Sequence, residues 1–389
     1  MQHLGGYCSI RQAQSYAMCR LSAVTILSFP IFTASMQYLR WLLFPFSLLY
    51  GLVIIIRNWL YDTGLFKSRE FDLPVICVGN LEVGGAGKSP ITEYLVRLLK
   101  SNYKLATLSR GYGRKTKGFL IAGATTTATE IGDEPSQFHH KFPDVTVAVC
   151  VVRVAGIEKL KTDHDLILLD DAFQHRAVKP GLNILLFDYN QLLQPKLLLP
   201  AGNLREPFSG RWRADIMVVT KCPTALSVEG MTRCYEQISP LNWQPLFFSE
   251  IAYQPMQDLH GNVIDVAIDA GTTVFLLTGL ANPKPLIQHL SQSTSNIIHH
   301  NYPDHHQFSL KNIAKLADAF AACKSTKKVI ITTEKDAQRL GVHELLPVLA
   351  PLPVWVLPIG VKFLNNGQQA FDQIIQNYVR EHTQHNRIY

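Results

Sequence analysis

The chain has 389 residues, 47% of them hydrophobic and 17% charged, with a formal net charge of +7. This length favours two domains, and the composition excludes a polytopic membrane protein. The positive balance suits an anionic ligand, nucleic acid or an acidic membrane surface without choosing among them. The cysteines are odd in number and lack C-x-x-C spacing, which argues against a zinc site and a disulfide framework and for a cytoplasmic body.

The N-terminal region holds an uncharged apolar run at residues 41–56, WLLFPFSLLYGLVIII, which begins after Arg40. The run is shorter than the ~20 residues of a full span, so a buried core helix is an alternative. We interpret it as a membrane helix. The basic residues that follow it are Arg57, Lys67 and Arg69, and they favour the cytoplasmic side after the run.

An earlier apolar stretch, residues 21–34, resembles the core of a signal peptide. Cleavage there would export the body of the chain, which conflicts with free cysteines and with the nucleotide site described below. We therefore favour Met36 as the start, with residues 1–35 as an untranslated extension, over a second hydrophobic segment. The membrane helix and its lead-in are then expected at residues 36–70.

A glycine-rich loop follows a short apolar strand in VICVGNLEVGGAGKSP, residues 75–90. The strict pattern G-x-x-x-x-G-K-[ST] fails there, because Glu82 stands where its first glycine would be. Glycine amides at a helix start still converge on phosphate oxygens, with Lys88 on the β- and γ-phosphates and Ser89 on Mg²⁺. An ordinary glycine-rich turn is the alternative. The residues predicted to bind the nucleotide are Glu82, Val83, Gly84, Gly85, Ala86, Gly87, Lys88 and Ser89.

Two acidic motifs follow this loop in the chain. IGDEPSQF puts Asp133 and Glu134 on a loop before a predicted helix. A carboxylate there can accept the proton of an attacking hydroxyl, and a helix-capping acid is the alternative. LILLDD ends a buried strand with Asp170 and Asp171, which can hold Mg²⁺ beside the phosphate loop. Exposed aspartates in a turn are the alternative for this second motif.

Apolar strands alternate with helical patterns from residue 75 onwards. This alternation predicts an α/β fold with a mostly parallel, doubly wound sheet like that of P-loop NTPases. The pattern weakens at residues 239–262 and then resumes. We therefore expect a P-loop kinase domain at residues 71–245 and a second, smaller α/β domain at residues 246–389.

One further motif lies in the second domain, where NYPDHHQF holds Asp304, His305 and His306. By itself this motif has three interpretations: a surface turn, a weak metal site, or a partner for the carboxylate that accepts the hydroxyl proton. Together the motifs indicate an Mg²⁺-dependent P-loop protein, and they do not separate a kinase from a GTPase-like switch or a metallochaperone. We find no N-K-x-D motif of the kind that recognises guanine, and VTKC at residues 219–222 matches that motif poorly.

The ordered set of motifs is more specific than any one of them. VGNLEVGGAGKSP, LSRGYGR, GDEP, LDDAFQHR, LPAGNLREP, ADIMVVTK, PDHH and TTEKDA occur in this order. The set resembles the tetraacyldisaccharide 4′-kinases of the lipid A pathway in Gram-negative bacteria. The resemblance runs from about residue 39 to the end of the second domain, and the phosphate loop of that family also lacks the first glycine.

The resemblance implies an inner-membrane enzyme whose catalytic domains face the cytoplasm. It would transfer the γ-phosphate of ATP to the 4′-hydroxyl of an acylated glucosamine disaccharide 1-phosphate, a lipid A precursor. Its ligands would be that lipid in the bilayer, ATP and Mg²⁺, with no nucleic acid and no obligate protein partner. A kinase of a soluble sugar is an alternative that the apolar helix disfavours.

The resemblance also implies roles for individual residues. Asp133 would be the catalytic base, with His305 supporting it and Lys88 binding the phosphates. Mg²⁺ would be organised by Ser89, Glu134, Asp170 and Asp171, and the substrate would be met by Arg110, Tyr112, His175 and Arg205. A buried structural histidine is the alternative for His175. Ala172 replaces an expected glycine and Ser89 a usual threonine, and neither change removes a required functional group.

Overall fold

The computed structural model describes residues 29–304, 306–342 and 344–385. These residues form two compact units. The first comprises the described part of Met1–Trp59 together with Pro195–Phe208, and the second comprises the described parts of Leu60–Gln194 and Ser209–Tyr389. Each unit is described by itself below.

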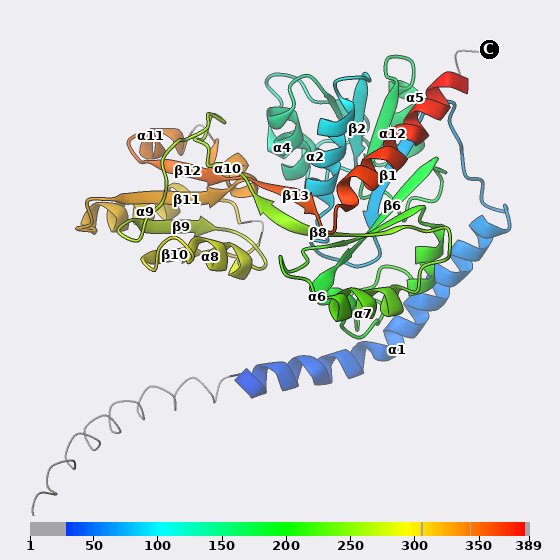
Figure 1. The fold of residues 1–389 in the computed structure, drawn as a ribbon, viewed down its shortest axis with the longest axis horizontal. Helices are drawn as coiled ribbons and strands as arrows, with labels where there is room; N and C mark the ends of the chain where they lie inside the picture. Colours follow the sequence, from blue (N-terminus) through cyan, green and yellow to red (C-terminus); the bar gives the residue numbers. More distant parts are fainter. Residues whose placement is uncertain (1–28, 305, 343, 386–389) are drawn as a thin grey trace, which may run out of the picture. The chain divides into compact units, whose positions relative to one another are not determined.

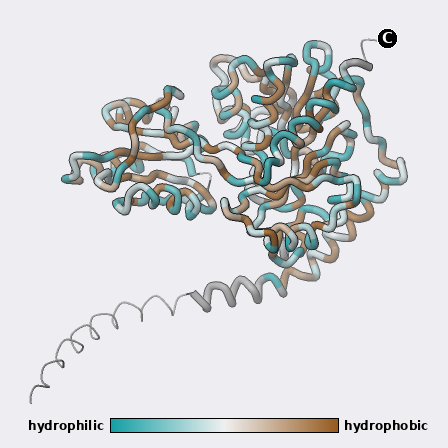
Figure 2. Tube along the Cα trace, viewed as in Figure 1, coloured by the Kyte–Doolittle hydropathy of each residue, from teal (hydrophilic) through white to brown (hydrophobic). Residues whose placement is uncertain are grey.

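The first unit is built on helix α1 (Phe29–Asp62), whose last residues lead into the second unit. Its window Leu42–Asp62 has 21 residues, a mean hydropathy of 1.6 and only 11% of its residues buried. Hydrophobic residues recur along the coloured part of this helix (Figure 2). By length and composition this is a candidate membrane span, a test that core helices and signal sequences also pass. Its low burial argues against the core-helix alternative.

The rest of the first unit, Pro195–Phe208, is tied to α1 by hydrogen bonds. The Tyr50 hydroxyl donates to the Arg205 carbonyl at 2.7 Å, and the Ala201 amide donates to Ser47 Oγ at 2.9 Å. Asn58 Nδ2 donates to a Glu206 carboxylate oxygen at 3.2 Å. Polar groups on α1 therefore face this segment, while much of the apolar surface stays exposed.

The second unit contains the larger of two sheets, with nine strands in the described part of the chain, in the order β13-β8-β7-β6-β1-β5-β2-β4-β3 (Figure 1). All neighbours are parallel except β3 with β4 and β13 with β8. The strands are β1 (Val75–Asn80), β2 (Leu105–Ser109), β3 (Leu120–Ile121), β4 (Thr146–Val149), β5 (Leu166–Asp170), β6 (Leu182–Asp188), β7 (Ile216–Thr220), β8 (Leu246–Tyr253) and β13 (Ile359–Phe363).

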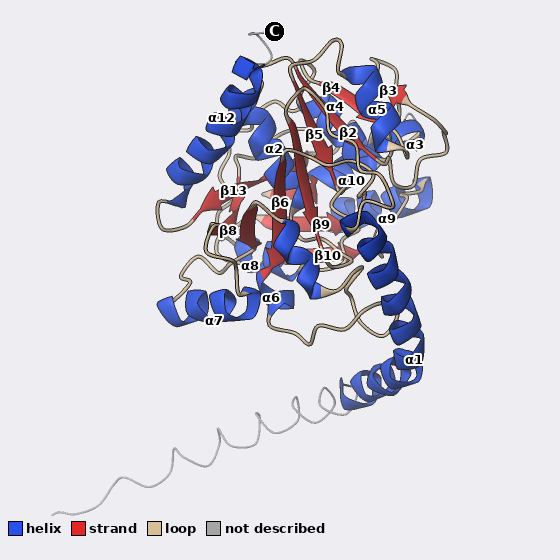
Figure 3. Cartoon of the chain, turned by 90° about the vertical axis from the view of Figure 1, so that its right-hand side faces the viewer, coloured by secondary structure: helices blue, strands red, loops and turns tan. Residues whose placement is uncertain are grey.

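Helices cover both faces of this sheet, and the central strands read as continuous apolar runs because both of their faces are buried (Figure 3). One face packs against α2 (Lys88–Leu99), α4 (Asp133–Lys141) and α12 (Gly367–His385). On the other face, α5 (Arg153–Leu160) approaches β2 closely enough that a side chain at Gly156 would strike Leu108. The remaining short helices are α3 (Ala128–Ile131), α6 (Tyr189–Leu192), α7 (Val228–Ile238) and the 3₁₀ helix Phe208–Arg213.

The smaller sheet is all parallel, in the order β10-β9-β11-β12, with strands β9 (Thr273–Thr278), β10 (Ile297–Asn301), β11 (Lys328–Thr333) and β12 (Val354–Leu357). One face packs against α9 (Leu310–Ala322), α10 (Glu334–Leu340) and α11 (Leu346–Leu349), and the other against α8 (Lys284–Leu290). The predicted fold class is confirmed: a large, mostly parallel sheet, a second smaller α/β sheet and an apolar N-terminal helix.

The chain passes between the two sheets along an antiparallel pair, β8 with β13, in which Tyr253 is the partner of Ile359. Figure 1 shows these two strands side by side between the sheets. The domain limits predicted at residues 245 and 246 stay a prediction.

Candidate active site

The phosphate loop connects β1 to α2 at the carboxyl edge of the larger sheet. Gly84 and Gly87 have φ angles of 106° and 80°, a region that favours glycine. A side chain at Gly87 would also lie 3.4 Å from Thr220, whose hydroxyl donates to the Ala86 carbonyl at 2.8 Å. The loop is therefore shaped by glycine and pinned to the end of β7.

Helix α2 begins at Lys88 with the N–H groups of its first turn facing the loop. Its N-cap residue is Gly87, and no described side chain caps it. Its first turn also contains no acidic residue. Uncapped N–H groups and the positive end of the helix dipole attract an anion, so this junction fits the phosphates of a nucleotide.

Lys88 is held over the loop by its neighbours. Its Nζ donates to Asn80 Oδ1 at 3.1 Å and lies 3.6 Å from Asp171 Oδ1. Asp171 has a φ of 50°, an uncommon conformation for a residue with a side chain. The structure brings the predicted Lys88 and Asp171 together and adds Asn80, the last residue of β1, which was not among the predicted site residues.

Asp170 ends β5 and is buried next to the phosphate loop. The Thr92 hydroxyl of α2 donates to it at 3.4 Å. Burial raises the pKa of Asp170 to about 7, and the negative charges of Glu134 and Asp171 add to this shift. The negative charges of Glu134 and Asp171 thus disfavour ionisation of Asp170, and a divalent cation would relieve this repulsion.

The donor atoms around this point fit Mg²⁺ bound together with phosphate. Ser89 Oγ, Glu134 and Asp170 offer hard oxygen ligands, and the Ser89 hydroxyl donates to Glu134 Oε1 at 2.9 Å. Within the described ranges, no group of three or more His, Cys, Asp or Glu side chains is gathered tightly enough to hold a metal alone. Mg²⁺ usually takes one or two carboxylates and completes its shell with substrate phosphates and water, so these residues meet its needs.

The acid pair Asp133 and Glu134 opens α4 rather than lying on a loop before it, as the sequence had suggested. Gly132, with a φ of 97°, turns the chain into this helix. Burial raises the pKa of Glu134, but Lys335, Lys88 and the Ser89 hydroxyl outweigh it and lower that pKa to about 2. Glu134 is therefore a carboxylate at every physiological pH.

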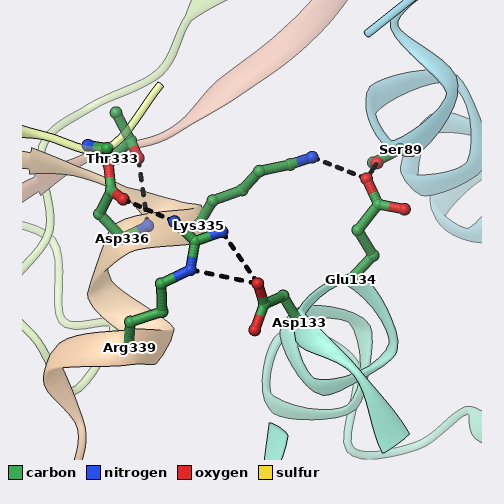
Figure 4. Close-up of polar contacts among 8 residues, drawn as sticks. Ser89, Asp133, Glu134, Thr333, Lys335, Asp336 and Arg339 are labelled. Carbon is green, nitrogen blue, oxygen red and sulfur yellow. Dashed lines mark hydrogen bonds and ion pairs between the residues drawn. The ribbon is translucent and has the colours of Figure 1, made fainter. Parts of the chain in front are cut away.

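Two cations from α10 of the smaller sheet reach this acid pair (Figure 4). Lys335 Nζ donates to Glu134 Oε1 at 2.6 Å. Arg339 donates to Asp133 Oδ2 from Nε at 3.1 Å and from Nη2 at 2.9 Å. The sequence analysis missed both residues. Their spacing of four, just after a predicted strand that ends in threonines, was the signal that could have found them.

The loop after β2 holds Arg110 and Tyr112 and packs against the segment before Asp133. A side chain at Gly111 would lie 2.7 Å from the Ile131 carbonyl, and one at Gly132 would lie 2.7 Å from the Tyr112 carbonyl. The Tyr112 side chain itself is 83% exposed. Two predicted substrate residues thus neighbour the acid pair through the backbone.

The remaining predicted residues are less closely connected to this site. His175 is half-buried in the turn that follows β5, and Arg205 belongs to the first unit. His305 lies outside the described residues. Its neighbour His306 contacts Asn312 Oδ1 through Nε2 at 3.1 Å and stacks on Tyr302, which fits a local structural role.

Known proteins resemble this chain over most of its length. The family model for tetraacyldisaccharide-1-P 4′-kinase matches residues 39–380. The tetraacyldisaccharide 4′-kinase of Phocaeicola vulgatus is 43% identical over 357 residues, which cover 90% of this chain and 97% of that protein. The enzyme of the same name from Flavobacterium johnsoniae is 45% identical over 351 residues, which cover 89% and 99%.

A solved structure also matches. The crystal structure of LpxK from Aquifex aeolicus in complex with ATP is 30% identical in sequence, with a TM-score of 0.69. The match covers 88% of this chain and 99% of that one.

Proposed function

Because this chain belongs to the tetraacyldisaccharide-1-P 4′-kinase family, we propose that its phosphate loop and acid pair carry out the phosphoryl transfer of that family. The chain is an ATP-dependent lipid kinase, which transfers the γ-phosphate of ATP to the 4′-hydroxyl of a lipid A precursor. The predicted family and activity are confirmed, and the switch, metallochaperone and soluble-sugar alternatives give way to them.

The observation that carries the assignment of residues is the hydrogen bond from Ser89 to Glu134. It joins the start of α2 to the start of α4 and so puts the acid pair at the mouth of the phosphate loop. In this arrangement the loop amides and Lys88 bind the β- and γ-phosphates. Ser89, Glu134, Asp170 and Asp171 would hold Mg²⁺, which neutralises charge on the phosphates when bound.

Asp133 is then the base for the acceptor. It accepts the proton of the 4′-hydroxyl as that oxygen bonds to the γ-phosphorus, and the bond from this phosphorus to the β–γ bridging oxygen breaks to leave ADP. Arg339 supports this role because its two donors fix one carboxylate oxygen of Asp133. The support of His305 for the base remains a prediction from the resemblance.

The lipid would be met by Arg110, Tyr112, His175 and Arg205. The exposure of Tyr112 beside the segment before Asp133 supports a contact with the sugar headgroup. The candidate span in α1 and a lipid substrate support attachment to the inner membrane with the catalytic unit in the cytoplasm. The positive net charge would favour an anionic bilayer surface.

The test is incubation of membranes that contain the protein with labelled ATP and acylated disaccharide 1-phosphate, with detection of a bis-phosphorylated lipid. Asp133→Ala should lower kcat by about 10²-fold or more and leave ATP affinity nearly unchanged, because it removes only the proton acceptor. Asp144→Ala is the matched control, since this exposed carboxylate pairs with Lys100 at 2.8 Å near the far end of α4. An effect of Asp133→Ala on KM alone would remove Asp133 from the role of base.

A further inference from the structure

Helix α10 carries two cations one turn apart, and the structure treats them differently. Lys335 and Arg339 are separated by four residues, so they lie on the same side of the helix. Both reach the acid pair at the start of α4 (Figure 4). Only one of them is also locked to its own sheet.

Arg339 is the fixed cation. Its side chain is 2% exposed, and its Nη1 donates to Asp336 Oδ1 at 3.0 Å. Asp336 is fully buried and also accepts from the Gly279 amide at 3.1 Å and the Thr333 hydroxyl at 2.8 Å. Asp336 thus holds one end of the Arg339 guanidinium while the other end binds Asp133, and Arg339 fixes α10 against α4.

Lys335 is the exchangeable cation. The side chains of Lys335 and Glu134 are 36% and 33% exposed, so both are accessible to a ligand that binds at the phosphate loop. Glu134 Oε1 accepts from both Lys335 Nζ and Ser89 Oγ. The ammonium therefore lies within two hydrogen-bond lengths of Ser89, the second residue of α2, at the phosphate loop. Lys335 thus contacts a carboxylate that we propose as a metal ligand, next to the residues proposed to bind the phosphates.

We propose that Lys335 is a second phosphate-binding lysine, which exchanges Glu134 for an oxygen of the γ-phosphate when ATP binds. This inference rests on the proposed function of the phosphate loop. Glu134 is then left for the metal, and the phosphoryl group is held by Lys88 from the larger sheet and Lys335 from the smaller one. A charged donor gains most on the oxygens that carry the charge of the transition state, so Lys335 acts in catalysis as well as binding.

The first experiment compares ATP with ADP on the full-length protein, because only ATP carries the group that Lys335 would bind. Lys335→Met should weaken ATP binding by about 10- to 100-fold, the range for a hydrogen bond to a charged group, and leave ADP binding unchanged. It should also lower kcat by about 10²-fold. Lys335→Arg keeps a charged donor and should recover part of both losses.

The matched control is Lys327→Met, which breaks an ion pair of similar length, 2.7 Å, with Asp269, in the loops that lead into β11 and β9 of the smaller sheet. It should change neither the ATP-to-ADP affinity ratio nor kcat. If Lys335→Met lowers Tm but keeps this ratio, Lys335 is only a structural latch and the proposal is overturned. Equal losses for ATP and ADP overturn it as well.

A second experiment, in metal-free buffer with EDTA, tests the exchange itself. Glu134→Gln removes the competing carboxylate and should tighten ATP binding when Lys335 is present, but not in the Lys335→Met background. A gain of the same size in both backgrounds would refute the exchange. Lys88→Ala in the same assay separates the two levels of inference. If the Lys88→Ala variant keeps full ATP affinity, the phosphate site itself is misassigned. If Lys88→Ala loses ATP affinity and Lys335→Met does not, the phosphate site is correct and only the role of Lys335 is misassigned.

Discussion

Two junctions between a parallel strand and a helix meet in this enzyme, and they are built in opposite ways. The β1–α2 junction is made of glycines, two with positive φ angles, and no described side chain caps its helix. The β11–α10 junction is closed by its own side chains: Thr333 caps α10 by accepting from the Asp336 amide at 3.2 Å, and buried Asp336 holds Arg339.

The difference shows how one architecture serves two purposes. The first junction leaves backbone donors unsatisfied by the protein, so it favours binding of an anion from outside. At the second junction, side chains of the junction itself bond the backbone N–H groups of the helix start. Its long cationic side chains, Lys335 and Arg339, extend from the helix to the acid pair. We therefore expect changes at the first to abolish ligand chemistry, and changes at the second to affect both stability and geometry.

The largest effect should follow Lys88→Ala, which removes the charged group of the first junction. Phosphoryl transfer should fall by at least about 10²- to 10³-fold, since a positioned donor to the reacting phosphate is lost. The measurement is transfer from labelled ATP to the lipid acceptor, with Tm as the check on folding. Lys179→Ala, an exposed lysine paired with Glu70, is the control and should remain active. Full activity of Lys88→Ala would remove the phosphate loop from the mechanism.

The next largest effect should follow Arg339→Met at the second junction. It leaves buried Asp336 and partly buried Asp133 without their cation, which costs about 3–5 kcal/mol in comparable buried pairs. Denaturant unfolding of the full chain measures this loss. Arg339→Lys keeps the charge without the fork of donors and should lose less. A loss of stability for Arg339→Met no larger than that of an exposed pair would mean that the second junction is not self-supporting.

The smallest effect concerns Asp170, whose pKa is raised to about 7 by burial and by Glu134 and Asp171. Between the unfolded pKa of ~3.9 and that value, the folded state holds a proton that the unfolded state lacks. The free energy of unfolding therefore falls as pH rises through this window. Asp170→Asn should remove that fall and, without nucleotide or metal, raise Tm at pH 8 relative to the unmodified enzyme, by about 2–4 °C per kcal/mol.

The same variant should lose activity, because the carboxylate whose burial is unfavourable without a cation is the one proposed to bind the metal. Measurement of Tm at pH 5 and pH 8 with EDTA provides the comparison. Asp163→Asn, at an exposed aspartate in the turn before β5, should leave the pH dependence unchanged. A Tm for Asp170→Asn that is lower at pH 8 would contradict the electrostatic repulsion described for this site.

The first junction was predictable from sequence and the second was not, for a physical reason. Glycines, Lys88 and Ser89 are neighbours in the chain, and Asp170 follows an apolar strand that must pair near β1 in a parallel sheet. The contacts of Lys335 with Glu134 and of Arg339 with Asp133 join residues 201 and 206 positions apart. No local pattern encodes such a pairing, so only the folded chain shows it.

Other differences have similarly local causes. The short apolar strand predicted before the glycine-rich loop extends to Asn80, whose side chain accepts a hydrogen bond from Lys88. The run that contains β12 and β13 reads as one apolar stretch, yet Pro358 separates two strands that join different sheets. Helix α4 also begins earlier than predicted, because the positive φ of Gly132 lets the helix start directly at Asp133.

The pairing of Tyr253 with Ile359 has a consequence for how this enzyme can diverge. The segment between these two positions has its two ends side by side at one edge of the larger sheet. This segment can be lengthened, shortened or replaced without changing the order of the strands that position the phosphate loop.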